Sequence, residues 1–468
     1  MVRFDGERTP AFKLTLAIIV GLVLTVPLFS VWLLVYDRRT QSEEATTSIS
    51  AGWGGPQAIA GPVLVIPYRA TATETVVQNG QSVTRSNEVM RELTLAPEIA
   101  QLSTDVRPQV RKRTIYEAVV YDAAVGGKAR FVLPPDLART GVDPARMDMS
   151  RAELRFGVSD PRGLGANPRV LVDGRPLRLQ PGGGSSGGRG FFGWVDASQL
   201  IARPITVDFA FKLKGNAAMS LAPQAGETSW TVRSSWPSPS FGGDFLPSSP
   251  PSVTDRGFLA EYRIGNLALG RSLVSTGDAG SSSIVDRVPP PSRVADTTTP
   301  VTGDAGPVQT AQISLIQPVD PYSQVNRATK YGFLFIGFTF LALLMFDVIG
   351  GVRVSAVEYL LMGAALILFF VLLLAFAEVI GFALAYIVAS AAIAGLNTAY
   401  SAAVLSSWRR AALIGGLLVG LYAVLYVLLS LEAYSLLIGA LLLFVALAGV
   451  MYATRRIDWG AGRSVPVA

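Results

Sequence analysis

The sequence contains no cysteine and no histidine among its 468 residues. Without cysteine the chain has no disulfide framework, no thiolate nucleophile, no zinc ribbon and no iron–sulfur cluster. Without histidine it has no Ser-His-Asp triad, no HExxH metal site and no imidazole general base. Charged residues are also scarce, at 16% against about 25% in ordinary soluble domains. This scarcity indicates that much of the chain does not face water.

Long hydrophobic runs account for the low charge. A helix needs about 20 apolar residues to cross a bilayer, and the run from Phe12 to Tyr36 carries no charge after Lys13. A cleaved signal peptide is the alternative, but its apolar core would span about 7–15 residues, so an uncleaved anchor is favoured. Five further runs crowd the C-terminal third: roughly Tyr331–Ile349, Glu358–Ala375, Ile380–Tyr400, Ala411–Ser430 and Tyr434–Ala453.

The charges between these runs predict an orientation in the membrane. The positive-inside rule places short loops rich in Lys and Arg in the cytoplasm, whereas the alternate short loops carry Glu378 and Glu432 and no basic residue. Both termini are therefore predicted to be cytoplasmic, and the net charge of +6 marks membrane loops rather than a nucleic-acid site. The deciding basic residues are Arg3, Arg8, Lys13, Arg353, Arg409, Arg410, Arg455, Arg456 and Arg463.

The predicted fold class is a membrane protein with an α-helical transmembrane bundle of six spans and a large β-rich domain outside the cytoplasm. A stretch rich in Ser, Thr, Pro, Gly and Asp, residues 275–306, predicts a disordered loop in that domain. The predicted parts are the cytoplasmic N-terminus (1–11), the anchor helix (12–36), the external domain (37–330), the five-helix bundle (331–453) and the cytoplasmic tail (454–468).

The external region shows the two-residue alternation of half-buried strands. Long helical periodicity is absent there, because Pro and Gly interrupt the region often. Asn79-Gly80 lies between two such segments and predicts a hairpin turn, since both residues tolerate positive φ. A sandwich or an open sheet is expected. The clearest alternating segments are Thr114–Tyr121, Lys128–Leu133, Ala152–Val158 and Ile205–Leu213.

A GxGxxG pattern from Gly188 to Gly193 carries little functional information. A dinucleotide site needs this pattern between a strand and a helix, with an acidic residue about 20 positions further on. Here the pattern ends a glycine run and no helix is predicted after it. Nucleotide binding is therefore not expected.

An aromatic and proline-rich segment, residues 236–247, is the candidate partner-binding loop of the external domain. A rigid loop of this kind can present apolar anchors to a partner. The alternative, and the commoner use of such a segment, is a structural corner that buries its rings and closes a turn with its one acid. The candidate residues are Trp236, Pro237, Phe241, Asp244 and Phe245.

Three acidic residues at the boundaries of predicted spans are candidate functional groups. Charge inside hydrocarbon is costly, so an acid in a membrane segment suggests a function by default. Asp347, Glu358 and Glu378 each lie near a predicted helix end, however, where water and headgroups are available. No acid or base falls at the middle of a predicted span, so a proton or ion pathway has little support.

Several segments together resemble the CreD family of bacterial inner-membrane proteins, also called cell envelope integrity proteins. They follow one another in order along nearly the whole chain: Gly55-Pro56-Gln57, Gly61–Pro67, Ser235–Pro247, Arg327–Tyr331, Tyr359–Glu378 and Thr454–Trp459. The Trp-Pro…Gly-Asp-Phe loop and the Thr-Arg-x-Ile-Asp-Trp end are the most specific. The resemblance implies an inner-membrane location with a periplasmic external domain, and a link to envelope integrity and β-lactam response. It implies no catalytic residues.

The predicted function is that of a non-enzymatic inner-membrane protein whose periplasmic domain senses, binds or scaffolds an envelope component. The lipid bilayer and a periplasmic or membrane protein are the expected partners, with no nucleic acid, cofactor or metal. One alternative is a transporter or channel formed by the C-terminal helices, although few polar residues are available to line a path. The other is an envelope hydrolase or transferase that uses carboxylates, a Ser-Lys pair or a metal.

Overall fold

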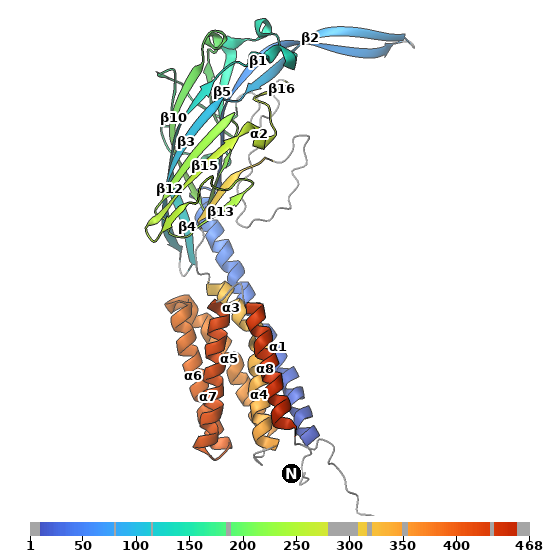
Figure 1. Cartoon of the computed structure of the whole chain (residues 1–468), viewed down its shortest axis with the longest axis vertical. Helices are drawn as coiled ribbons and strands as arrows, with labels where there is room; N and C mark the ends of the chain where they lie inside the picture. The colour runs from blue at the N-terminus through green and yellow to red at the C-terminus, as the bar shows by residue number, and fades with distance from the viewer. Residues whose placement is uncertain are drawn as a thin grey trace, which may run out of the picture. The chain divides into compact units, whose positions relative to one another are not determined.

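The structure is a computed structural model that describes residues 10–78, 81–113, 116–183, 189–278, 308–315, 321–348, 354–430 and 435–455. The chain forms two compact units (Figure 1). One is helical and comprises Met1–Glu43 and Val319–Ala468, and the other is rich in strands and comprises Glu44–Pro318. The predicted division into a membrane bundle and a β-rich domain has its counterpart in these two units.

Helices, most of them apolar, make up the first unit, and the end of α1 extends into the second. Their bounds are α1 Pro10–Ala51, α3 Pro321–Lys330, α4 Gly332–Val348, α5 Ala356–Ile380, α6 Phe382–Val404, α7 Trp408–Ser430 and α8 Ser435–Thr454. Within the described part of the chain, four helical segments are long and apolar enough to cross a bilayer: Phe12–Ile49, Ala356–Ile380, Phe382–Val404 and Trp408–Leu429. A fifth is added if α3 and α4, which meet at an angle of 41°, form one bent span. The sixth predicted span coincides with α8, which is not among these candidate segments, so the number six stays a prediction.

Two helix boundaries differ from the prediction. The first helix does not end at Tyr36 but continues to Ala51, because the polar residues after the apolar run contain no Gly or Pro to stop it. Residues 321–330, which were assigned to the β-rich domain, form the amphipathic helix α3 of the helical unit. Their polar side chains hide the helix from a search for continuous hydrophobic runs.

Aromatic side chains fill the interior of the bundle. Phe369 of α5 lies against Tyr422 of α7, with ring centroids 4.6 Å apart. Tyr386 of α6 donates its hydroxyl hydrogen to the backbone carbonyl of Tyr422 at 2.6 Å. A buried phenol needs such a partner because the apolar interior offers no water. The contact therefore ties α6 to α7 at a buried position.

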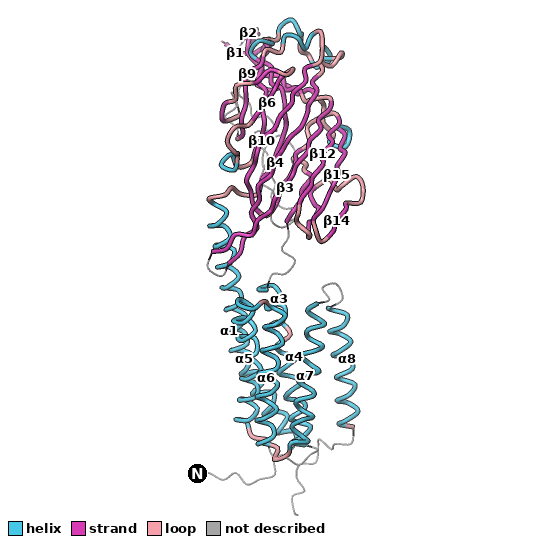
Figure 2. Tube along the Cα trace, turned by 90° about the vertical axis from the view of Figure 1, so that its left-hand side faces the viewer, coloured by secondary structure: helices cyan, strands magenta, loops and turns pink. Residues whose placement is uncertain are grey.

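The second unit contains two sheets (Figures 1 and 2). The nine-stranded sheet consists of β1 Gln57–Gln78, β2 Gln81–Leu95, β5 Ala152–Val158, β8 Gln180–Pro181, β9 Gly190–Val195, β11 Ala218–Ala222, β13 Pro239–Gly243, β16 Val274–Asp278 and β17 Ala311–Leu315. The eight-stranded sheet consists of β3 Ile99–Arg113, β4 Tyr116–Phe131, β6 Arg169–Val172, β7 Arg175–Pro176, β10 Ile205–Asn216, β12 Glu227–Ser234, β14 Ser252–Thr254 and β15 Gly257–Gly265.

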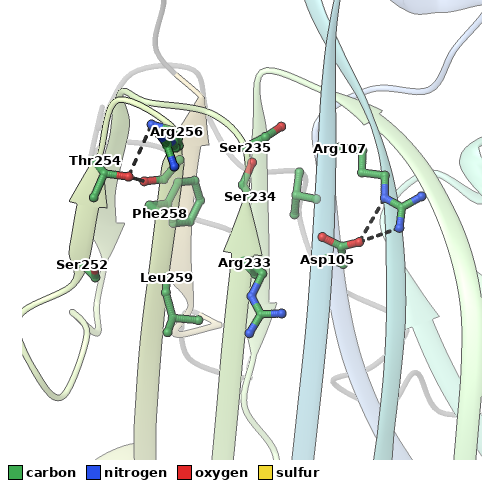
Figure 3. Close-up of a pocket in the computed structure, with 12 residues that line it drawn as sticks. Asp105, Arg107, Arg233, Ser234, Ser235, Ser252, Thr254, Arg256, Phe258 and Leu259 are labelled. Atoms are coloured by element: carbon green, nitrogen blue, oxygen red, sulfur yellow. Dashed lines mark hydrogen bonds and ion pairs between the residues drawn. The ribbon is translucent and has the colours of Figure 1, made fainter.

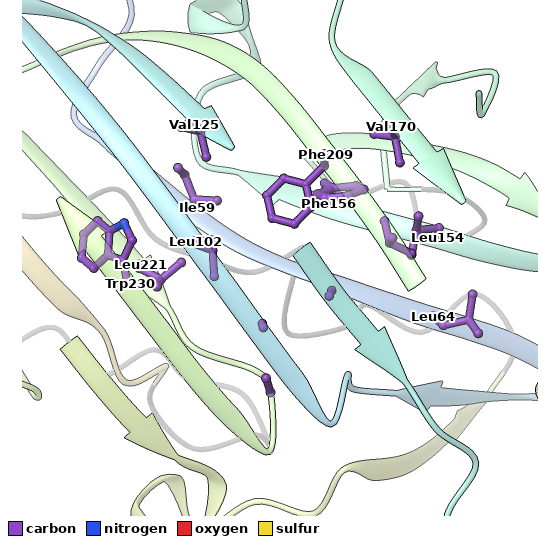
Figure 4. Close-up of a cluster of buried hydrophobic side chains, with 14 of the residues drawn as sticks. Ile59, Leu64, Leu102, Val125, Leu154, Phe156, Val170, Phe209, Leu221 and Trp230 are labelled. Carbon is purple, nitrogen blue, oxygen red and sulfur yellow. The ribbon is translucent and has the colours of Figure 1, made fainter. Parts of the chain in front are cut away.

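Side chains from both sheets form one hydrophobic core (Figure 4). Leu64 and Phe156 come from the nine-stranded sheet, and Leu102, Phe209 and Trp230 come from the eight-stranded sheet. Alternating burial along β10 shows the expected inward and outward sides of a strand. The arrangement is a β-sandwich, the first of the two architectures that the sequence predicts.

Most predicted strands are confirmed with small changes in their limits. Ala152–Val158 is strand β5 with the predicted bounds. The strand pairing of the predicted hairpin is also confirmed, because β1 pairs antiparallel with β2 and Gln78 lies opposite Gln81, while Asn79 and Gly80 lie outside the described residues. The GxGxxG glycines 190 and 193 lie in strand β9, so no helix begins at this pattern.

Two strand predictions are corrected. Residues 116–121 and 128–131 of the two predicted segments belong to a single strand, β4, whose central glycines make room for the neighbouring strands, while residues 114 and 115 lie outside the described residues. A Cβ atom on Gly127 would lie only 2.6 Å from the ring of Phe209. The predicted disordered loop begins too early, because residues 275–278 belong to β16 and pair with β2. Its remaining part, 279–306, lies outside the described residues.

A buried amide joins three segments at the start of β1. Gln57 is fully buried, and its Nε2 atom donates to the backbone carbonyls of Asp160 at 3.1 Å and Lys214 at 2.9 Å. Its Oε1 atom accepts from the hydroxyl of Ser159 and the backbone N–H of Asp160, both at 3.3 Å. The amide thus uses its full hydrogen-bonding capacity and links β1 to β10 and to the turn after β5.

Asp160 adds a charged contact to this junction. Its carboxylate accepts two hydrogen bonds from the side chain of Arg162, at 2.9 and 2.7 Å, and one from the backbone N–H of Gly55 at 3.1 Å. The Arg162 guanidinium, which stabilises the ionised form, lowers the pKa of Asp160 to about 2. Gly55 and Gln57 belong to the Gly-Pro-Gln motif of the sequence, whose conformation this network explains.

Candidate functional site

The structure packs the predicted partner-binding loop against the sandwich core. Trp236, Phe241 and Phe245 are half-buried and contact the core cluster. The ring of Phe241 meets Phe258 edge-on, with centroids 5.8 Å apart. Pro237 is exposed. The rings therefore serve as part of the core while they keep some surface that faces outward.

Asp244 closes this loop. Its carboxylate accepts a hydrogen bond from the backbone N–H of Thr310 at 2.8 Å, and its own backbone N–H donates to the Thr310 carbonyl at 2.7 Å. The acid thus fixes the loop to the residue just before β17. This is the role that the structural-corner interpretation assigns to it. Partner binding by the loop stays a prediction.

One of the three membrane acids belongs to a buried ion pair. Asp347, near the end of α4, is 2% exposed, and its Oδ1 atom lies 2.6 Å from Nζ of Lys13 on α1. The same ammonium group donates to the backbone carbonyl of Asp347 at 3.0 Å. A buried carboxylate of this kind requires a cationic partner, so the pair joins α1 to α4.

The other two acids also have structural partners. Glu358 forms a capping box with Ser355 at the start of α5: its carboxylate accepts from the Ser355 backbone N–H at 2.6 Å, and the Ser355 hydroxyl accepts in return. Glu378, near the end of α5, accepts a hydrogen bond from the hydroxyl of Tyr322 on α3 at 3.2 Å. Each of these contacts stabilises a helix end or a helix pair.

A pocket of about 560 Å³ opens on the β-rich unit (Figure 3). It lies where β3, β12, β14 and β15 run side by side in the eight-stranded sheet. Ser235, the last residue before Trp236, lines it, so the pocket adjoins the predicted loop in sequence. The remaining lining residues are Asp105, Val106, Arg107, Arg233, Ser234, Ser252, Thr254, Arg256, Gly257, Phe258 and Leu259.

Three arginines and one acid set the charge of this pocket. Asp105 pairs with Arg107, with the closer contact at 2.9 Å. Among the described residues, no carboxylate pairs with Arg233 or Arg256, and both are exposed. The pocket therefore carries a formal excess of two positive charges, because one arginine of the three is neutralised. Serine and threonine hydroxyls complete its polar lining. Such a lining suits an anionic ligand.

The sequence did not point to these arginines. Arg233 occupies an outward position on β12, immediately before the Ser-Ser-Trp-Pro segment, and Arg256 lies in the turn between β14 and β15. The outward position could have been read from the strand alternation. The residues that lie beside Arg233 in the sheet could not be predicted, because β12 pairs in parallel with β3, which lies more than 100 residues earlier in the chain. Among the described residues, no group of three or more acids is placed to hold a metal ion.

Comparison with known proteins identifies the family. The profile of the family described as Inner membrane protein CreD matches residues 9–460. The Inner membrane protein CreD of Escherichia coli (strain K12) is 30% identical to this chain over 459 residues, which cover 97% of this chain and 95% of that protein. The match includes both structural units and the motifs that carried the resemblance. The chain therefore belongs to the CreD family of inner membrane proteins.

Proposed function

We propose that this chain is a non-enzymatic, multi-pass inner-membrane protein whose β-rich unit lies in the periplasm and binds an envelope component. Through that binding it contributes to envelope integrity and to the response to envelope stress, β-lactams included. The observation that carries the proposal is the arginine-lined pocket of about 560 Å³ beside the Trp-Pro loop. The absence of His and Cys from the sequence, which removes the commonest catalytic groups, favours binding over catalysis.

The basic loops support the proposed orientation. Arg409 and Arg410 begin α7, and the positive-inside rule places them in the cytoplasm, which puts the β-rich unit on the other side. The lack of cysteine makes a direct test simple. A membrane-impermeant maleimide should label Ser252→Cys in intact cells, whereas Ser406→Cys, between α6 and α7, should react only after permeabilisation. Labelling of both in intact cells, or the reverse pattern, would refute the orientation.

Crosslinking in intact cells tests the binding function. A photoreactive amino acid at Ser235, an exposed lining residue of the pocket, should capture an envelope component on illumination. The matched control is Ile201, a residue of the same unit that is 64% exposed and does not line the pocket. Capture from Ser235 and not from Ile201 supports the proposal. The absence of a product, or identical products from both positions, contradicts it.

A further inference from the structure

We propose that the pocket between β3, β12, β14 and β15 binds a phosphate-bearing headgroup through Arg233 and Arg256. The inference deepens the proposed function and rests on it, because it names the chemical class of the envelope component. Its starting point is the combination of two arginines without a carboxylate partner among the described residues and a cavity of about 560 Å³ that both of them line.

Arg233 has no acidic partner among the described residues because the nearest acid in the strand pairing is already paired with another arginine. The Cα atom of Arg233 lies opposite that of Asp105 in the parallel pair of β12 and β3. The carboxylate of Asp105, however, accepts a hydrogen bond from Nε of Arg107 at 3.0 Å and forms an ion pair with Nη2 of the same arginine at 2.9 Å. Figure 3 shows this pair turned toward each other and the guanidinium of Arg233 turned away from it. Arg233 is therefore available to a ligand.

The turn between β14 and β15 holds Arg256 in place. Its backbone N–H donates to the hydroxyl of Thr254 at 3.3 Å, and that hydroxyl donates to the carbonyl of Gly257 at 3.1 Å. Gly257 has a φ of 133° and packs so closely on Ser234 that any Cβ atom would overlap with the Ser234 carbonyl. These contacts fix the backbone from which the Arg256 side chain extends over the pocket.

The chemistry of the lining favours phosphate over carboxylate. A guanidinium group presents paired N–H donors that match either anion, but a phosphate monoester carries up to two negative charges and three terminal oxygens, against one charge and two oxygens for a carboxylate. A phosphate exposes additional acceptor oxygens, which can accept hydrogen bonds from a second arginine or from the hydroxyls of Ser235 and Ser252. Val106 and Leu259 supply an apolar part of the wall, which suits the glycerol or chain next to a phosphate.

The shape of the pocket indicates an extended ligand. Arg233 lies opposite Leu259 in the pair of β12 and β15, whereas Arg256 precedes Leu259 by three residues along the chain, and Figure 3 shows Arg256 beside Thr254 and Arg233 level with Leu259. A ligand that reaches both arginines is larger than a single phosphate ion. We therefore expect phosphate esters to bind more tightly than inorganic phosphate. The esters could be lipid headgroups or soluble phosphate compounds, and the test separates these two sources.

Titration calorimetry on the purified full-length protein in an uncharged detergent tests the inference. The probes are inorganic phosphate, glycerol 3-phosphate and dihexanoylphosphatidylglycerol, with dihexanoylphosphatidylcholine as the zwitterionic comparison. The double substitution Arg233→Gln/Arg256→Gln should weaken binding of the esters by about tenfold or more, the loss expected when charge-assisted hydrogen bonds are removed. Binding of only the phosphatidylglycerol probe identifies a lipid headgroup, and binding of glycerol 3-phosphate as well identifies a soluble ester as sufficient.

A matched double substitution controls for net charge. Arg169 and Arg263 are exposed residues of the same eight-stranded sheet and do not line the pocket. Arg169→Gln/Arg263→Gln removes the same charge and should change the affinity by less than about twofold, because only long-range screened interactions are lost. Equal losses in both double variants, or the absence of ester binding to the natural sequence, would overturn the inference. If the Ser235 crosslink then still captured an envelope component, the proposed function would stand and only the phosphate assignment would fail.

Discussion

Replacement of Gln57 by methionine is the sharpest test of how the β-rich unit is held together. Methionine has nearly the same length and shape as glutamine but can neither donate nor accept in the same way. The substitution removes the four hydrogen bonds that Gln57 makes to Ser159, Asp160 and Lys214. Each of these buried groups loses one hydrogen-bond partner, whereas the volume of the site hardly changes.

The expected magnitude follows from the number of bonds lost. A neutral hydrogen bond contributes about 0.5–1.5 kcal/mol, so four of them suggest a loss of about 2–6 kcal/mol in the free energy of unfolding. At about 2–4 °C per kcal/mol, the melting temperature should fall by about 4–24 °C. Gln57→Glu should be worse at neutral pH, because a carboxylate in the same place would face two carbonyl oxygens without a proton to donate.

Thermal unfolding of the full-length protein in an uncharged detergent, followed by circular dichroism of the β-sheet signal, measures this effect. Gln101→Met on β3 is the matched control, because Gln101 is exposed, and surface substitutions of this kind change stability by less than about 0.5 kcal/mol. Identical melting curves for Gln57→Met, Gln101→Met and the natural sequence would refute the view that the buried amide organises this junction.

Three further predictions concern single contacts. Asp347→Asn should destabilise the helical unit by about 2–4 kcal/mol, because it leaves the ammonium of Lys13 without its counter-charge. In melting experiments in detergent, the swapped variant Lys13→Asp/Asp347→Lys should be more stable than Asp347→Asn. A swapped variant that is no more stable would contradict a direct pair. The pKa of Asp160 is lowered from 3.8 to about 2, so its stabilisation is complete above pH 3.8 and disappears as the pH falls toward 2. We expect a contribution of about 1 kcal/mol, below the full value of the shift because the partner guanidinium is largely exposed; acid titration of Asp160→Asn should show a correspondingly shallower loss, and an unchanged profile would refute the assignment. Gly127→Ala should cost about 1–3 kcal/mol in urea unfolding, because the added methyl group overlaps with the backbone carbonyl of Gln101 and with the ring of Phe209, and an unchanged unfolding midpoint would refute this overlap.

Local patterns predicted the parts of this molecule that depend on neighbouring residues. The apolar runs located the membrane helices, since the length of such a run directly measures its fit to a bilayer. Alternation located β5 and β10, and the Asn-Gly pair predicted the antiparallel pairing of β1 with β2. These predictions succeeded because each depends on only a few consecutive side chains and on their own conformational preferences.

Errors arose where contacts with distant residues override local preference. Two separate strands were predicted from the segments 114–121 and 128–133, yet β4 runs through the glycines between them because it pairs with β3 on one side and β10 on the other. Residues 275–278 suggested a disordered loop, yet they pair with the free edge of β2. The helix Pro321–Lys330 was assigned to the wrong unit, because only one side of it is apolar.

The sequence by itself determined the division into membrane helices and a β-rich domain, the family, and the absence of His and Cys chemistry. Only the tertiary structure revealed the arginine-lined pocket and the role of Gln57. Backbone hydrogen bonds between strands are the same for every residue type, so the parallel pairing of β12 with β3, which sets Arg233 opposite Asp105, leaves no local signature. That pairing depends on how side chains from the whole domain pack into one core, and this packing exists only in the folded chain.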